Sequence, residues 1–213
     1  MTNLSPHVAA CEQLLKVLEP KSEIVVQTID TLERLEELWR IDSEAYGNCS
    51  LTLEEFSAWW RRYEFGSRNL ISQGRIAASI GIYPLYPEQA LLFSTGQMEE
   101  SDLTPVTLTE CEQCPVSDWY FSGIVVRNDL RGWGSPLPML LKLGIGYWLA
   151  SGHVAYPLSA WAIAEYSAGA RLLNFLGFSK FKDGSLLPDG YALYRLHLAC
   201  EREALTVFRT RGL

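Results

Sequence analysis

Several features that mark other protein classes are scarce in this chain. Its 213 residues include only three histidines, and its five cysteines are an odd number. The cysteines have no repeating spacing, which suits reduced thiols better than a disulfide framework and predicts an intracellular, cytoplasmic protein. Cys111-x-x-Cys114 resembles half of a zinc site, but the histidines stand singly along the chain, so we expect no metal.

An excess of positive charge and a long apolar run are also missing. Eighteen Lys and Arg against 25 Asp and Glu give a net charge of -7, so nucleic acid is not expected as a partner. The apolar stretch 137–150 contains Lys142 and is too short to span a bilayer, and the N-terminus lacks a basic segment followed by an apolar run. We therefore expect no membrane partner. Both a monomer and a homodimer are compatible with the sequence.

Hydrophobic periodicity predicts alternating helices and strands. The expected helices cover 5–19, 31–46, 52–63, 135–151 and 165–176, and the expected strands cover 23–29, 69–73, 75–83, 119–126, 156–162 and 190–198. Thr52 and Glu55 have the spacing of a capping box, and Gly47 and Gly177 stand where helices should end. Residues 91–117 are acidic and turn-rich, which indicates either a mobile insertion or a substrate-shaping loop with short elements.

The most informative stretch is 121–136, which reads FSGIVVRNDLRGWGSP. An apolar strand leads into a turn containing Gly132 and Gly134, and a helix follows at once. Glycines let backbone N–H groups converge, while the helix turns its positive end toward the same place. This combination predicts a cradle for phosphate or pyrophosphate.

This stretch resembles motif A of the GNAT N-acetyltransferase superfamily. Val126, Arg131 and Gly134 fill the slots for the valine, the basic or amide residue and the loop glycine, whereas Pro136 stands in a slot for Gly or Ala. A second likeness is the later helix that ends in Gly-Phe. Counting back from Gly177, the slots for Asn, Ala and Tyr hold Tyr166, Gly169 and Leu173.

The resemblance implies an α/β fold with a central mixed, mostly antiparallel sheet flanked by helices. It covers residues 23–199 as one acyltransferase domain. Residues 1–22 would add an N-terminal helical extension, and residues 200–213 would form a C-terminal tail.

The activity that the resemblance implies is transfer of an acyl group, most simply acetyl, from acetyl-CoA or another acyl-CoA to an amine. The acceptor would be a small molecule or a protein. In this family, cradle amides bind the pyrophosphate of coenzyme A and the central strand pairs with its pantetheine arm. The corresponding residues are Arg131, Gly132, Trp133, Gly134 and Ser135 for the pyrophosphate, and Ile124, Val125 and Val126 for the arm.

The catalytic groups are less directly indicated, because family members often use a Glu on the central strand as base and a Tyr on the last helix as acid. Leu173 stands in the Tyr slot, so Tyr166 on the same helix becomes the candidate acid. Residues on one face of the central strand, or acids of the insertion, become the candidate bases. These are Asp118, Tyr120 and Ser122 on the strand, and Glu99 and Glu100 in the insertion.

The departures from the family pattern keep a second function open. Pro136 and Pro138 have no N–H to offer a phosphate, although Ser135 as N-cap followed by Pro136 is a preferred helix start. The alternative is a catalytically silent module that binds acyl-CoA or a partner. A third reading, transfer of a longer acyl chain, would use Trp39, Trp59 and Trp60, but a Trp stripe at helical spacing is more often core.

Overall fold

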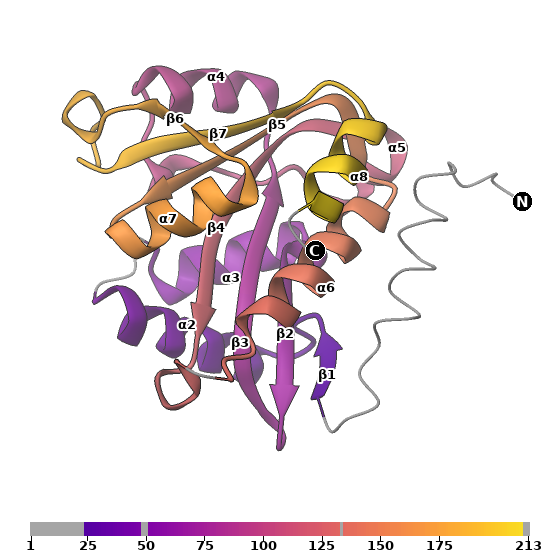
Figure 1. Cartoon of the computed structure of the whole chain (residues 1–213), viewed down its shortest axis with the longest axis vertical. Helices are drawn as coiled ribbons and strands as arrows, with labels where there is room; N and C mark the ends of the chain where they lie inside the picture. The colour runs from indigo at the N-terminus through magenta and orange to yellow at the C-terminus, as the bar shows by residue number, and fades with distance from the viewer. Residues whose placement is uncertain (1–23, 48–50, 133, 211–213) are drawn as a thin grey trace, which may run out of the picture. The chain divides into compact units, whose positions relative to one another are not determined.

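The structure is a computed structural model that describes residues 24–47, 51–132 and 134–210. Its sheet has seven strands in the order β1-β2-β3-β4-β5-β7-β6. Strands β4 and β5 run parallel, whereas β1 with β2, β2 with β3, and β7 with both β5 and β6 are antiparallel. Helices flank this mixed sheet (Figure 1). The expected fold class is confirmed, but the expected helix 5–19 lies outside the described residues.

The strand bounds follow the predicted pattern closely. They are Ile24–Gln27 (β1), Ser67–Ser72 (β2), Arg75–Pro84 (β3), Val116–Val126 (β4), Val154–Ala164 (β5), Ser179–Lys182 (β6) and Ala192–Leu198 (β7). The helices are Leu32–Tyr46 (α2), Leu53–Arg62 (α3), Pro87–Thr95 (α4), Leu108–Gln113 (α5), Leu137–Ala150 (α6), Ser167–Leu176 (α7) and Glu201–Thr210 (α8). None of the helices in this described part combines the length and apolar character needed to cross a bilayer.

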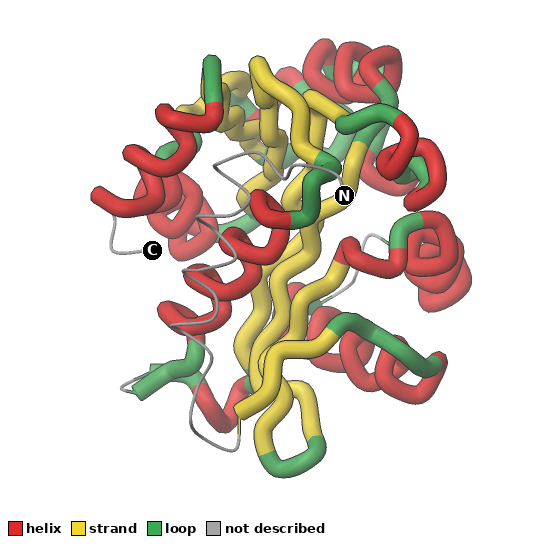
Figure 2. The backbone as a smooth tube through the Cα atoms, turned by 90° about the vertical axis from the view of Figure 1, so that its right-hand side faces the viewer, coloured by secondary structure: helices red, strands yellow, loops and turns green. Residues whose placement is uncertain are grey.

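Contacts group the chain into two compact units, and strands β3 and β4 run through both. The first unit comprises residues 1–82 and 123–152, and the second comprises 83–122 and 153–213. Within the first unit, α6 covers one face of the strands, and α2 and α3 cover the other (Figure 2). The approach of α6 is very close at Gly144, where an added Cβ would clash with the Cγ2 atom of buried Ile80.

Local sequence signals explain where the first helices begin and end. Thr31 caps α2 by accepting a hydrogen bond from the Arg34 amide, and Gly47 ends it with φ of 84°. The capping box that begins α3 is present in both directions, with Thr52 accepting from the Glu55 amide and Glu55 accepting from Thr52. Those bonds lower the pKa of Glu55.

In the second unit, consecutive residues of β4 point to opposite faces of the sheet. Tyr120 packs edge-on against Phe93 of α4, and Phe121 packs edge-on against Phe178, which follows α7. The insertion 91–117 is built of short elements, including α5 with its own capping box from Thr107 to Glu110. Of the two readings of this segment, the one with short elements matches the structure, and its role in shaping a substrate site stays a hypothesis.

The sequence reading did not include β6 or α8. The four residues of β6 are Ser-Lys-Phe-Lys, which are too few and too polar to give a strand signal. Helix α8 lies in the stretch expected as a tail, and it buries Ala204 and Phe208 one turn apart. The expected domain boundaries themselves stay a prediction.

Candidate functional site

The glycine turn lies between β4 and α6 in the first unit. Gly132 and Gly134 have φ of 100° and 81°, a backbone region that favours glycine. A Cβ built on either residue would meet nothing within 4 Å, so both backbones border open space. The conformation of the loop, rather than crowding, therefore requires glycine at these positions, and the space beside them can admit a ligand.

The turn also leaves backbone donors without partners. The amide of Ser135 donates to the Gly132 carbonyl at 3.1 Å, and the amide of Arg131 donates to the Asn128 carbonyl at 3.4 Å. Among the described residues, the amides of Gly132 and Gly134 have no hydrogen-bond partner. Of the five residues predicted to hold pyrophosphate, these two offer free donors in this structure, and Trp133 lies outside the described residues.

Helix α6 begins one residue later than the sequence suggested. Pro136, not Ser135, is the N-cap residue, and Pro138 lies in the first turn. The Ser135 hydroxyl still accepts a hydrogen bond from the Leu137 amide at 3.3 Å, so it satisfies one of the backbone N–H groups at the start of the helix. Pro136 has αR backbone angles, and its carbonyl accepts the first bond of the helix, from the Leu140 amide at 3.0 Å. The two positions for the start therefore differ only in how the terminal residue is assigned.

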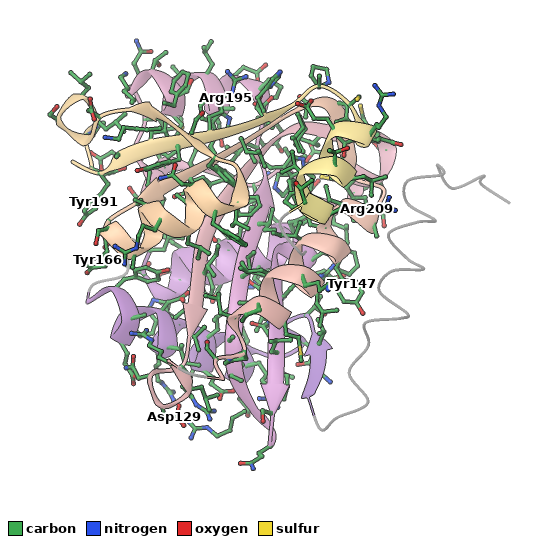
Figure 3. The ribbon with its side chains drawn as sticks, in the orientation of Figure 1. Asp129, Tyr147, Tyr166, Tyr191, Arg195 and Arg209 are labelled. Carbon is green, nitrogen blue, oxygen red and sulfur yellow. The ribbon has the colours of Figure 1, made fainter. Side chains whose placement is uncertain are left out.

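Arg127 anchors the loop to the neighbouring strand, and nothing in the sequence singled it out. Its amide donates to the Ala77 carbonyl at 2.9 Å, and its guanidinium donates to the Ile76 carbonyl at 3.2 Å. The guanidinium also forms a bidentate ion pair with Asp129, which Figure 3 labels. The hydrogen bonds from Arg127 hold the pKa of the Asp129 carboxyl below its usual value.

The last residues of β4 present polar backbone groups on the side away from β3. Because the Arg127 amide bonds Ala77 of β3, strand alternation turns the N–H and C=O of Ile124 and Val126 to the opposite side. There the Tyr46 hydroxyl donates to the Ile124 carbonyl at 2.9 Å and accepts from the Ile124 amide at 3.4 Å. The Arg131 Nε donates to the Val126 carbonyl at 2.9 Å.

The candidate bases on the central strand have different surroundings in the second unit. The Asp118 carboxylate accepts from the Ser117 hydroxyl at 3.1 Å and from Trp161 Nε1 at 3.4 Å. Ser122 is half-buried, and Tyr120 is completely buried. Asp118 thus already has two hydrogen-bond donors within the second unit.

Tyr120 belongs to a buried acidic cluster with a residue of the insertion. Burial raises the pKa of Tyr120 well above its usual value, and interaction with the Glu100 carboxylate raises this pKa further. Glu100 is 5% exposed, whereas its neighbour Glu99 is exposed. The Glu100 amide donates to the Asp189 carboxylate at 3.3 Å. Burial also raises the pKa of Glu165. Buried titratable groups with a shifted pKa are candidates for a functional site.

Comparison with solved structures places this geometry in a known fold. The loading GNATL domain of CurA from Lyngbya majuscula matches with a TM-score of 0.60 at 14% identity, over 83% of this chain and 98% of that one. Ard1 from Thermoplasma volcanium matches with a TM-score of 0.55 at 10% identity, over 84% of this chain and all of that one. This chain has the GNAT fold. The resemblance inferred from the two motifs is confirmed at the level of fold.

A third GNAT neighbour was solved with its ligands. The diaminobutyrate acetyltransferase EctA from Paenibacillus lautus, in complex with L-2,4-diaminobutyric acid and coenzyme A, matches with a TM-score of 0.53 at 12% identity, over 83% of this chain and 95% of that one. No family model matches the sequence of this chain, and no curated protein matches it.

The second stretch that resembles the family pattern lies in α7. Gly177 ends the helix with φ of 99°, as its position predicted. Leu173, in the slot for Tyr, is buried in the core and cannot donate a proton. Tyr166 is the N-cap residue of α7 and is 53% exposed (Figure 3). Its role as the acid stays a prediction.

The cysteine pair lies at the end of α5. Cys111 is buried in α5, and burial raises the pKa of its thiol to about 12, whereas Cys114 is exposed. Within the described residues, no three His, Cys, Asp or Glu side chains lie close enough to hold a metal ion.

Proposed function

We propose that the chain is a CoA-dependent N-acyltransferase, most simply an acetyltransferase, that acts on an amine. The observation that carries this proposal is the pair of unpartnered amides of Gly132 and Gly134 beside the beginning of α6. Free N–H groups next to a helix N-terminus are suited to the pyrophosphate of coenzyme A. The GNAT fold supports the same assignment, and one neighbour of that fold was solved with coenzyme A.

The pantetheine arm of acyl-CoA would then extend along β4, where Ile124 and Val126 turn their backbone groups away from β3. An extended chain containing amides pairs with such groups as an added strand does. Among the described residues, the amides of Gly132 and Gly134 would hold the phosphates. The Arg131 and Ser135 amides are bonded within the loop, and Pro136 and Pro138 lack an N–H. We therefore expect modest affinity for the nucleotide end.

In the reaction, the amine nitrogen attacks the thioester carbonyl carbon, the C–S bond breaks, and the thiolate leaves with a proton. A base must remove a proton from the attacking nitrogen. We propose Glu100 for this role, because it is a buried carboxylate in the insertion and its charge acts on the buried Tyr120 phenol. Asp118 and Ser122 stay candidates for holding a water, and Tyr166 for protonating the thiolate.

A silent binding module is the competing function, and buried Leu173 in the slot of the catalytic Tyr favours it. The test is a thiol-release assay with acetyl-CoA and a panel of diamines, amino acids and peptide N-termini. Amine-dependent release of free CoA supports a transferase. Saturable acetyl-CoA binding without release for any acceptor class would support the silent module.

A further inference from the structure

The Tyr46 hydroxyl makes the same two hydrogen bonds to β4 that the amide of a bound ligand would make, on the side of the strand away from β3. This hydroxyl is both a donor and an acceptor for a single residue, at 2.9 Å to the Ile124 carbonyl and 3.4 Å from the Ile124 amide. A secondary amide of an extended ligand offers one N–H and one C=O to a strand in the same way. One side chain of the first unit thus occupies the backbone pair that a strand-like ligand would need.

From this contact we infer that Tyr46 competes with the pantetheine arm for Ile124, so that acyl-CoA binds only after Tyr46 is displaced. The inference rests on the function proposed above. On this inference, the end of α2 determines whether the pantetheine arm of the ligand can bind to β4. The nucleotide end of the ligand binds at the cradle independently of α2. The apparent affinity for acyl-CoA is then reduced by the fraction of molecules in which Tyr46 covers the strand.

The position of Tyr46 suits a contact that must be released. It is the last residue of α2, directly before Gly47, whose amide closes the helix by donating to the Ser43 carbonyl at 2.9 Å. The last turn of α2 has no basic residue and carries exposed Glu44, so its side chains do not offset the negative end of the helix dipole. Helix ends fray more readily than helix interiors, and displacement of Tyr46 requires only this last turn to open.

The experiment compares two ligands in calorimetric titrations of the full chain and a Tyr46→Phe variant. Coenzyme A carries the arm, whereas 3′-phospho-ADP carries only the nucleotide and pyrophosphate. The variant keeps the ring and removes both hydrogen bonds to Ile124. We expect it to bind coenzyme A about threefold to tenfold more tightly, which is what losing one or two competing hydrogen bonds allows. Its affinity for 3′-phospho-ADP should stay within about twofold of the wild type.

A matched control is Tyr147→Phe, because the Tyr147 ring lies over the Arg68 guanidinium at 5.6 Å and belongs to α6. This variant should bind both ligands as the wild type does. Unchanged or weaker binding of coenzyme A by Tyr46→Phe, with 3′-phospho-ADP still bound, would overturn the competition and leave the proposed function standing. Failure of the wild type to bind either ligand at millimolar concentration would instead overturn the proposed function, and the competition with it.

Discussion

The Arg131 side chain folds back onto the strand that precedes it, and its Nε atom donates to the Val126 carbonyl oxygen at 2.9 Å. This bond closes the cradle loop against the end of β4. The guanidinium also places a positive charge on an exposed part of the loop, next to the free amides of Gly132 and Gly134. The arrangement fixes the loop before any ligand arrives, which lowers the entropic cost of binding.

We therefore expect Arg131→Ala to weaken binding of 3′-phospho-ADP. Losing one hydrogen bond and a nearby positive charge should raise its Kd about fivefold to twentyfold. Isothermal titration at low and high salt measures the effect, and the loss should shrink at high salt because the charge is screened. Equal affinities for variant and wild type would show that Arg131 has no part in the cradle.

Glu100 should be the more important of the two neighbouring acids in the insertion. Glu100→Gln removes the buried carboxylate and should lower kcat about 100-fold or more if this group is the base. Glu99→Gln changes its exposed neighbour and should leave kcat within about twofold. Steady-state assays with the best amine acceptor compare the two. A similar kcat for both variants would exclude Glu100 as the base.

Replacing two helical glycines with alanine should change the unfolding free energy in opposite directions. In α6, the added methyl of Gly144→Ala would clash with Ile80, so we expect a loss of about 1–3 kcal/mol in unfolding free energy. In α7, a Cβ on Gly169 would lie 3.8 Å from the Ala164 Cβ, which is an ordinary contact. Gly169→Ala should therefore stabilise the protein by about 0.5–1 kcal/mol. Urea denaturation measures both changes, and a stabilising Gly144→Ala would contradict the close packing of α6.

Glu165 should make stability depend on pH in a defined direction. Burial raises its pKa in the folded state, so the folded protein binds more protons than the unfolded chain between the two pKa values. Stability from this group therefore falls as pH rises through that range. Glu165→Gln should raise the Tm at pH 7, and the gain should disappear below about pH 3.5, where both states are mostly protonated. A gain that grows toward low pH would contradict this account.

The sequence predicted most of the fold because its local signals agree with the tertiary structure. Gly47 and Gly177 end helices as expected, and Thr52 with Glu55 forms the capping box. The cradle turn was located from Gly132 and Gly134, whose positive φ angles only glycine adopts freely. These features depend on residues that are neighbours in sequence, which is why sequence spacing reveals them.

The parts that escaped prediction depend on contacts between distant residues. No local pattern reports that Tyr46 bonds Ile124, 78 positions further along the chain. Arg127 reaches carbonyls of β3 in the same way, and the pairing of Tyr120 with Glu100 needs the insertion to fold over the strand. Strand β6 was missed because a four-residue strand with three polar residues has little strand signal of its own and forms by pairing with β7.

The central claim is that the glycine turn holds the pyrophosphate of acyl-CoA, and Gly134→Asp tests it most directly. The new carboxylate would enter the open space beside the free amides and repel phosphate. Gly74→Asp is the control, because Gly74 has a similar φ of 74°, also borders open space and lies in the hairpin turn between β2 and β3. Calorimetric titration with acetyl-CoA should show saturable binding for the wild type and Gly74→Asp, and none for Gly134→Asp. Binding of equal strength by all three proteins would contradict the account.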